Sequence, residues 1–467
     1  MVYSTASKEM RLLKTMTIAM AAAACGGRLV GTAVPDAPIG RAVIDSRAVE
    51  PGDLFVAYRG EKTDGHRYIP TAWEKGAVCA LAEYLPEGAE GPAILVDDVQ
   101  RALEQIAAAY RRTLSLPVIG ITGSVGKTTA KEMIASVLSQ RFRVLKTEGN
   151  HNNQIGVPMT LSRIEREHEI AVVEMGISGF GEMTLLAEMA KPTIAVFTMI
   201  GRAHLEFLHD LDGVLRAKTE MIALMPDDGV VIVNGDNEQL KKLSCRQKLL
   251  RFGLGEDCDV RAADVTLTPA GETRCRILFE GRSIPVSIPA YGRQMIYAAL
   301  EGAAVGLVMG MTDAEIAAGI AAYQTVGRRS AITDTGFVTL VDDSYNANPE
   351  SMRCAMDSLL QLPGRHVCLL ADMLEMGPDS AQMHRDLGVY AAEKGIDLLA
   401  CCGPLSRQMA AAAGEHGAKA VWYPTAEELI AALPALLQKG DRVLVKASLG
   451  MHMERAAEAV KKLESNE

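Results

Sequence analysis

The chain has 467 residues, which at roughly 150 residues per domain leaves room for about three domains. Lys and Arg number 48 against 58 Asp and Glu, giving a net charge of −10, and aromatic residues make up only 4%. This composition argues against a sequence-independent nucleic-acid binder, which needs a basic face and stacking rings. It does not exclude a small anionic ligand, because a pocket can be locally positive on an acidic protein.

Cysteine usage indicates a reducing compartment. Nine cysteines occur without a CxxC pair, which fits reduced thiols in a cytoplasmic protein better than a disulfide framework or a zinc site. The adjacent Cys401 and Cys402 end an apolar run (IDLLACC), which predicts a buried strand.

The N-terminus mimics a short signal peptide, because Lys8, Arg11 and Lys14 precede the apolar TMTIAMAAAAC. The run is short and Ala-rich, and Gly26 follows at once, so we expect instead a short amphipathic helix with a Thr at its start and a Gly at its end. No stretch approaches the roughly 18–20 apolar residues of a membrane span. We therefore expect a soluble, intracellular protein with no membrane span.

Three segments differ in pattern, and we expect one domain in each: residues 1–112, 113–328 and 329–467. The first alternates short strands and turns with helices, which predicts a small α/β domain. In the second, strands alternate with helices, which indicates a parallel sheet covered on both faces. The third repeats this pattern and predicts a Rossmann-like, doubly wound domain. The expected strands lie within 41–49, 53–60, 77–84 and 93–98, then 116–122, 170–176, 193–201 and 229–236, and finally 337–343, 366–372, 396–403, 420–424 and 441–448.

A glycine-rich turn joins a buried strand to a helix in GITGSVGKTTAKE, residues 120–132. Such glycines let backbone N–H groups converge on phosphate oxygens, and the helix N-terminus adds its positive dipole end. Lys127 can reach the β- and γ-phosphates, and the Thr128 hydroxyl can reach Mg²⁺. The first glycine of a strict GxxxxGK[ST] motif would fall on Ile121, yet the segment predicts a nucleotide site. The expected nucleotide-binding residues of this loop are Thr122, Gly123, Ser124, Val125, Gly126, Lys127, Thr128 and Thr129.

Other polar residues follow strands of the same segment. Glu174 ends an apolar strand, a place where carboxylates commonly hold Mg²⁺. His204 lies just past another strand, where a structural role is as good an interpretation as a ligand role. Lys218 falls on a helix, where a solvated surface charge is the default. The run NHNN at 150–153 is either a hydrogen-bonding cluster or a solvated loop.

Together these motifs resemble the Mur ligases, ATP-dependent enzymes that form amide bonds in peptidoglycan assembly. TGSVGKTT has the form of that family's P-loop, and the resemblance runs from about residue 16 to residue 460. It is greatest to the branch that attaches D-alanyl-D-alanine to a UDP-linked muramoyl tripeptide. The stretches that carry it are NHNNQIGVP (150–158), DDSYNANPESM (342–352) and ADMLEMG (371–377), with further likeness in 45–66 and 446–454.

The resemblance implies the reaction. ATP phosphorylates the terminal carboxylate of the UDP-muramoyl tripeptide, and the amine of D-Ala-D-Ala attacks the acyl phosphate. Phosphoryl transfer depends mainly on positioning and charge neutralisation, which two metal ions and a lysine can supply. The resemblance thus implies ATP and Mg²⁺ as cofactors, small-molecule partners and a monomer.

The resemblance also implies roles for individual residues. Thr128 and Glu174 would hold one Mg²⁺, and His204 and a carbamylated Lys218 would help to hold a second. Carbamylation explains a lysine at a metal, because it converts the cation into a carboxylate-like ligand. The implied catalytic residues are Lys127, Lys218, His204 and Arg328.

At the boundary with the C-terminal segment, Arg328 would reach the γ-phosphate when the domains close. Asp343 would contact the ribose, and Asn346 lies on the same loop. These three complete the expected nucleotide site. The UDP-muramoyl substrate is expected at Ser46, Arg47, Asp64, Gly65, His66, Asn152 and Asn153.

Some positions depart from the family pattern. Where the family has a His and two Asn that contact adenine, this chain has Gln294, Met295 and Ala298. Met cannot copy the paired donor and acceptor of an amide, so adenine recognition by this segment is expected to differ. Leu449 stands where the family has Arg, and Ala371 where it has Gly.

Three alternatives therefore stay open beside the ligase. They are a related ligase with another acceptor, a non-catalytic paralogue that binds UDP-linked peptides, and a regulatory P-loop ATPase.

Overall fold

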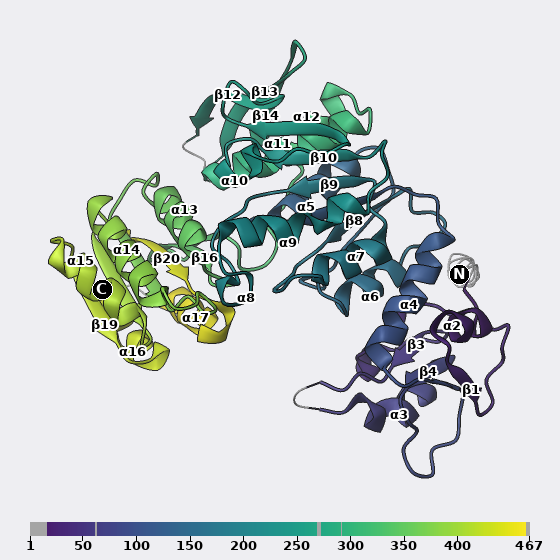
Figure 1. The fold of residues 1–467 in the computed structure, drawn as a ribbon. Coiled ribbons are helices and arrows are strands. Elements are labelled where there is room, and N and C mark those ends of the chain that lie inside the picture. The colour runs from purple at the N-terminus through teal and green to yellow at the C-terminus, as the bar shows by residue number, and fades with distance from the viewer. Residues whose placement is uncertain (1–15, 61–62, 269–271, 291, 464–467) are drawn as a thin grey trace, which may run out of the picture.

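The computed structural model describes residues 16–60, 63–268, 272–290 and 292–463. It has three α/β domains, with the N-terminal domain at lower right in Figure 1, the C-terminal domain at left and the central domain between them. Each domain is built on its own sheet, of five, nine and six strands. The predicted three-domain α/β fold is confirmed, whereas the exact domain boundaries stay predictions. Lys8, Arg11 and Lys14 lie outside the described residues.

The N-terminal sheet has the order β1-β5-β4-β3-β2 and is parallel except for β1, an edge strand that sequence analysis did not anticipate. Helix α2 begins after Thr17, whose hydroxyl accepts from Met20 N, and ends at Gly26 with φ of 65°. The expected short helix is thus confirmed, but all its residues are apolar, so it is not amphipathic. The elements of this domain are α2 (Ile18–Cys25), β1 (Arg28–Val30), β2 (Ala42–Val43), η1 (Ser46–Ala48), β3 (Leu54–Val56), η2 (Gly65–Tyr68), α3 (Ile69–Glu74), β4 (Cys79–Ala82), β5 (Ala93–Leu95) and α4 (Val99–Arg112).

The central sheet has the order β14-β13-β12-β11-β10-β9-β6-β8-β7. Strands β6 to β12 are parallel, as expected for β6, β8, β9 and β10. Strands β7 and β11 were not anticipated, nor was the antiparallel extension formed by β12, β13 and β14. The strands here are β6 (Val118–Thr122), β7 (Val144–Lys146), β8 (Ile170–Glu174), β9 (Ile194–Phe197), β10 (Val230–Asn234), β11 (Lys248–Gly253), β12 (Val260–Leu267), β13 (Thr273–Phe279) and β14 (Arg282–Ile288). The helices are α5 (Lys127–Leu138), α6 (Gly156–Ser162), α7 (Glu182–Ala190), α8 (Leu205–Leu208), α9 (Leu211–Ala223), α10 (Glu238–Lys241), α11 (Arg293–Val308) and α12 (Asp313–Ala321).

Burial on both faces explains why the inner strands of this sheet are mostly apolar. Along β8, Ala171 and Val173 belong to one hydrophobic core, whereas Ile170 and Val172 belong to the core on the opposite face. A covered parallel sheet requires apolar residues at every position, because successive side chains point to opposite faces. The strand then ends at Glu174, so that a carboxylate marks the carboxyl edge of the sheet.

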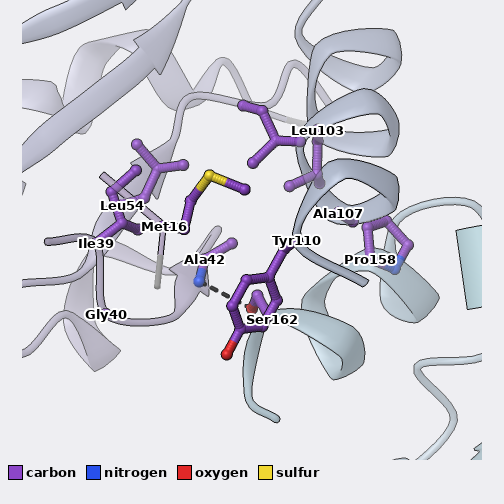
Figure 2. A pocket seen from close by; sticks show the side chains of 11 residues that line it. Met16, Ile39, Gly40, Ala42, Leu54, Leu103, Ala107, Tyr110, Pro158 and Ser162 are labelled. Atoms are coloured by element: carbon purple, nitrogen blue, oxygen red, sulfur yellow. Dashed lines mark hydrogen bonds between the residues drawn. The ribbon is translucent and has the colours of Figure 1, made fainter. Parts of the chain in front are cut away.

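The N-terminal and central domains share a hydrophobic core. Helix α4 packs against α2 on its own side and against α6 and α7 of the central domain. Figure 2 shows the seam, where a cavity of about 30 Å³ lies between Leu103 and Ala107 of α4 and Pro158 of α6. The Ala42 N–H donates to Ser162 Oγ at 3.0 Å across it. A cavity of this volume is too small for a substrate.

The C-terminal sheet has the order β15-β16-β20-β17-β18-β19, with β15 antiparallel to β16. Cys401 and Cys402 are fully buried in β18, which confirms the predicted buried strand. The strands are β15 (Ala331–Asp334), β16 (Thr339–Asp343), β17 (His366–Ala371), β18 (Leu398–Cys402), β19 (Ala420–Tyr423) and β20 (Arg442–Lys446). The helices are α13 (Pro349–Leu359), α14 (Ser380–Glu393), α15 (Ser406–Glu415), α16 (Ala426–Leu436), η3 (Leu449–Met451) and α17 (Glu454–Lys461).

The C-terminal domain meets the central domain through polar contacts. Arg202 pairs with Glu350 at 3.2 Å, and Ser358 Oγ donates to Gln294 Oε1 at 2.9 Å. Within the described residues, no hydrophobic core cluster includes members of both domains. Such an interface is typical of domains that move relative to each other.

Helices long and apolar enough to cross a bilayer are absent from the described part of the chain.

Candidate active site

The glycine-rich loop between β6 and α5 has the backbone of a phosphate-binding loop. Gly123 has φ of +151°, and a Cβ there would lie 2.0 Å from Thr198 Oγ1, so no side chain fits. Gly126, with φ of 88°, precedes α5 and provides no side-chain cap. The first N–H groups of α5 are therefore open to an anion, whose charge the helix dipole favours. Lys127 Nζ donates to Gly123 O at 2.8 Å, so the lysine folds back over the loop.

Hydrogen bonds to the segment after β9 hold this loop in place. Ser124 N donates to Met199 O at 2.7 Å, and Ser124 Oγ donates to Gly201 O at 2.9 Å. Thr198 Oγ1 donates to Val125 O. Contacts within the protein therefore give the loop its shape. Thr122 Oγ1 is buried and has no hydrogen-bond partner among the described residues, while Val125 and Thr129 are partly exposed.

Glu174 lies at the centre of the predicted metal site and is only 1% exposed. Thr128 Oγ1 donates to its Oε2 at 2.8 Å, and Asn152 Nδ2 donates to its Oε1 at 2.7 Å. A hydroxyl beside a buried carboxylate is the oxygen donor set that Mg²⁺ prefers. Thr128 and Glu174 therefore fit the ion that sequence analysis assigned to them. Asn153 serves its own loop, because its Oδ1 accepts from Ile155 N and Gly156 N.

The structure brings Lys218 and His204 close to this group. Lys218, on α9, is 1% exposed, and burial holds the pKa of its amine well below the usual value, with Lys127 adding to the shift. Burial also lowers the pKa of His204, and Lys218 and Lys127 contribute through charge repulsion. Such influence requires proximity, so residues far apart in sequence converge at the carboxyl edge of the sheet. Burial likewise lowers the pKa of Lys127, which Glu174 opposes.

His204 sits between the central and C-terminal domains. It has φ of 54°, and its Nδ1 lies 2.8 Å from Oε2 of Glu375 without the angles of a hydrogen bond. Glu375 lies in the ADMLEMG stretch and also has a positive φ, of 61°. The two residues thus place a C-terminal loop against the predicted metal site. A histidine nitrogen and an uncharged lysine are poor partners for Mg²⁺, and Lys218 fits the ion only as the carbamate.

Arg328 and Arg329, at the start of the C-terminal domain, contact different groups. Arg328 Nη1 lies 3.5 Å from Glu454 Oε2 on α17, so the structure does not bring it to the loop. Arg329 stacks over the Tyr345 ring at 4.0 Å and contributes to lowering the pKa of Lys127. Arg329 was not among the expected site residues, although the adjacent arginines of VGRR (326–329) were the available signal.

Asp343 and Asn346 are both held by Lys446. The Lys446 ammonium donates to Asp343 Oδ2 and, at 2.8 Å, to Asn346 O. Asp343 Oδ1 also accepts from Ser330 N at 2.9 Å, which joins the start of the domain to this loop. These contacts hold the loop against the start of the domain, and its ribose contact stays a prediction.

The predicted substrate residues of the N-terminal domain form a turn and an exposed edge. Asp64 caps η2, accepts from Tyr84 OH at 2.6 Å and lies 2.6 Å from His66 Nδ1. His66 Nε2 accepts from Glu83 N, so the proton sits on Nδ1 and the ring is fixed. A Cβ on Gly65 would lie 2.6 Å from Tyr58 O, so only glycine fits there.

Arg47 is, in contrast, well placed to meet a ligand. Its side chain is 88% exposed and pairs with Asp45 at 2.8 Å, and Ser46 precedes it in η1. His66 is only 1% exposed and so stabilises the turn rather than presenting itself to solvent. The substrate roles of all five residues of this domain stay predictions.

The departures on α11 have structural uses. Gln294 Oε1 accepts from Ser358 Oγ at 2.9 Å and from Cys354 Sγ at 3.5 Å, both on α13. Met295 and Ala298 are buried in the core of the central domain. Met295 and Ala298 therefore pack in the core, and Gln294 joins the central domain to the C-terminal domain. Leu449 is 45% exposed in η3.

The comparisons with known proteins agree over nearly the whole chain. The family model described as Mur ligase middle domain matches residues 121–306, and that described as Mur ligase, glutamate ligase domain matches 327–449. A third, described as Mur ligase family, catalytic domain, matches 39–111. The UDP-N-acetylmuramoyl-tripeptide--D-alanyl-D-alanine ligase of Bacillus subtilis is 36% identical, with 88% of this chain and 90% of that protein covered. The enzyme of the same name from Escherichia coli is 35% identical, with 89% and 92% covered.

Solved structures give the same result. MurF from Acinetobacter baumannii superimposes with a TM-score of 0.86 at 32% identity, covering 96% of this chain and 99% of that one. MurF ligase from Thermotoga maritima, solved in complex with ADP, has a TM-score of 0.80 at 28% identity, with 90% and 97% covered. The fold and the loop thus define a three-domain P-loop protein of the α/β class. The chain belongs to the Mur ligase family.

Proposed function

We propose that the protein is an ATP-dependent ligase that joins D-alanyl-D-alanine to UDP-N-acetylmuramoyl-tripeptide in peptidoglycan precursor synthesis. The relatives named for this activity align along 88–89% of the chain, and the Thermotoga neighbour was solved with ADP. The observation that carries the proposal is the uncapped N-terminus of α5 beside Lys127, with the Thr128 hydroxyl bonded to the buried Glu174. The nine free cysteines support a cytoplasmic site of action.

The loop would bind the triphosphate. The open N–H groups of α5 and the Lys127 ammonium would hold the β- and γ-phosphates, with Gly123 allowing close backbone approach. Thr128 and Glu174 would hold Mg²⁺, which when bound neutralises phosphate charge and draws the carboxylate and the triphosphate together. As the carbamate, Lys218 would supply oxygen ligands for a second site, with His204 beside it. Burial lowers the pKa of the Lys218 amine and so favours the uncharged form, which adds CO₂ to give a carbamate.

The chemistry proceeds in two displacements. A carboxylate oxygen of the tripeptide attacks the γ-phosphorus, and ADP leaves. The amine nitrogen of D-Ala-D-Ala then attacks the acyl carbon, and phosphate leaves with the carboxylate oxygen. Acyl phosphates hydrolyse readily, so the site must exclude water before the first step. The polar interface between the central and C-terminal domains would allow such closure, which would carry Arg328, Asp343 and Asn346 toward the nucleotide.

The decisive experiment is an endpoint assay read by mass spectrometry. ATP, UDP-muramoyl-tripeptide and D-Ala-D-Ala are expected to give the UDP-muramoyl-pentapeptide, with one ADP and one phosphate per amide bond. Single amino acids, or UDP-muramoyl precursors with shorter peptides, should give much less product. Product with another acceptor instead would identify a related ligase. Phosphate release that ignores both substrates would indicate a regulatory ATPase, and no turnover with intact substrate binding would indicate a non-catalytic paralogue.

A further inference from the structure

One buried lysine beside the predicted metal site has no role in the reaction described above. Lys131 lies on α5, four residues after Lys127, and is fully buried. Its Nζ donates to Gly149 O at 3.1 Å and lies 3.2 Å from Glu132 Oε1 and 3.8 Å from Glu174 Oε2. Lysines are almost never fully buried unless they are paired. These three acceptors therefore stabilise the buried ammonium of Lys131, and Lys131 in turn fixes the positions of the acceptors.

Lys131 is the inner lysine of a chain of four charges. Lys146, whose side chain is 43% exposed, is bonded to Glu132 Oε2. The order from the surface inward is thus Lys146, Glu132, Lys131 and Glu174, two positive and two negative groups. Of the two lysines, Lys131 faces Glu174, the carboxylate that would hold Mg²⁺, whereas Lys146 pairs with Glu132.

Lys131 also fixes the loop that carries Asn152. Gly149 belongs to that loop, and its carbonyl accepts from Lys131 while Asn152 Nδ2 donates to Glu174 Oε1. Glu174 is therefore held on one oxygen by Asn152 and faces Thr128 and Lys131 with the other. One ammonium thus sets both the carboxylate and the loop that orients it. Groups that orient metal ligands in this way typically change metal affinity by 10–100-fold when they are replaced.

We propose that Lys131 is a positioning residue of the ligase reaction, which holds Glu174 and the loop at 147–153 in the arrangement that receives Mg²⁺ with the nucleotide. This inference rests on the proposed function, because it takes Glu174 as the ligand of the ion. Lys131 acts through Glu174 and does not touch the phosphates.

The test is calorimetric titration of the full chain with ADP, with and without Mg²⁺. In Lys131→Met the affinity for ADP with Mg²⁺ should fall by about tenfold or more, and the affinity for ADP alone should be unchanged. Lys146→Met is the matched control, because it removes the outer lysine of the same chain of charges. It should bind both forms like the unaltered protein.

A second variant separates positioning from folding. Lys131→Met leaves two buried carboxylates with one lysine, which can destabilise the chain. Lys131→Met combined with Glu132→Gln restores the charge balance and should recover thermal stability, but not the Mg²⁺-dependent affinity. Unchanged or tighter binding of ADP with Mg²⁺ in a folded Lys131 variant would overturn the inference, as would recovery of that affinity in the double variant.

Failure of the proposed function gives a different result. If the unaltered protein bound ADP equally with and without Mg²⁺, the assignment of Glu174 itself would be wrong. If the unaltered protein formed the pentapeptide and Lys131→Met kept its Mg²⁺ dependence, only the role of Lys131 would be lost.

Discussion

Ser358 on α13 donates a 2.9 Å hydrogen bond to Gln294 on α11 and so joins the C-terminal domain to the central one. Gln294 stands where the family has the histidine of its adenine motif. In this chain the position therefore contributes to a domain interface, together with the ion pair of Arg202 and Glu350. Since no hydrophobic core crosses this interface in the described ranges, a few polar contacts set the relative position of the two domains.

We expect the domains to close on ligands. Small-angle scattering should show a smaller radius of gyration with ATP and UDP-muramoyl-tripeptide together than for the free protein, because closure excludes water from the acyl phosphate. Gln294→Ala removes the interdomain hydrogen bonds to Ser358 and Cys354 and should enlarge the free form without changing the fully liganded one. Identical scattering of the free and doubly liganded protein would contradict domain closure.

Replacing Lys127 by Ala should abolish ATP use. The ammonium is the mobile charge folded over the loop, and losing a donor aimed at developing charge typically costs on the order of 10²–10³ in rate. Phosphate release coupled to both substrates measures this loss. Binding of UDP-muramoyl-tripeptide, followed by calorimetry, should be retained, since the expected substrate residues lie on other segments. Loss of both together would indicate a folding defect.

Replacing Lys218 by Ala should strongly reduce ligase activity, because the variant lacks the carbamate oxygens. Short carboxylic acids such as acetate should restore part of the rate by occupying the vacated space beside His204. Arg216→Ala, an exposed change two residues away on α9, serves as the control and should not respond to acetate. Full activity of Lys218→Ala without added acid would show that the carbamate assignment is wrong.

The pairing of Asp64 with Tyr84 predicts a pH dependence of stability. The hydrogen bond from Tyr84 OH, with further ones from His66, holds the pKa of Asp64 below its usual value. A depressed folded-state pKa stabilises the fold above the unfolded-state value of about 3.9, and this stabilisation is lost as the pH falls toward the folded-state pKa. Tyr84→Phe should therefore lower the melting temperature at pH 7, and the difference should shrink below about pH 4. Thermal unfolding followed between pH 2 and pH 7 checks this, and a difference that stays constant with pH would contradict the assignment.

Local patterns were sufficient for much of the fold. Strand β18 is apolar at every position, and β8 at every position before Glu174, because both faces are covered, and this is visible in sequence. The antiparallel hairpins β12 to β14 were missed because only one face of them is buried, which leaves a weaker alternating signal. Edge strands β1 and β15 are short and partly exposed, so they lack an apolar run altogether.

The sequence by itself determined the phosphate loop, since glycines, a lysine and a threonine at fixed spacing act within one strand–turn–helix unit. Only the tertiary structure decided which distant side chains join that unit. It placed Lys218 and His204 beside Lys127, turned Arg328 toward Glu454, and buried Lys131 against Glu174. The physical reason is that burial and charge pairing depend on how separate strands end at a common sheet edge and how domains meet. Neither property can be read from spacing along the chain.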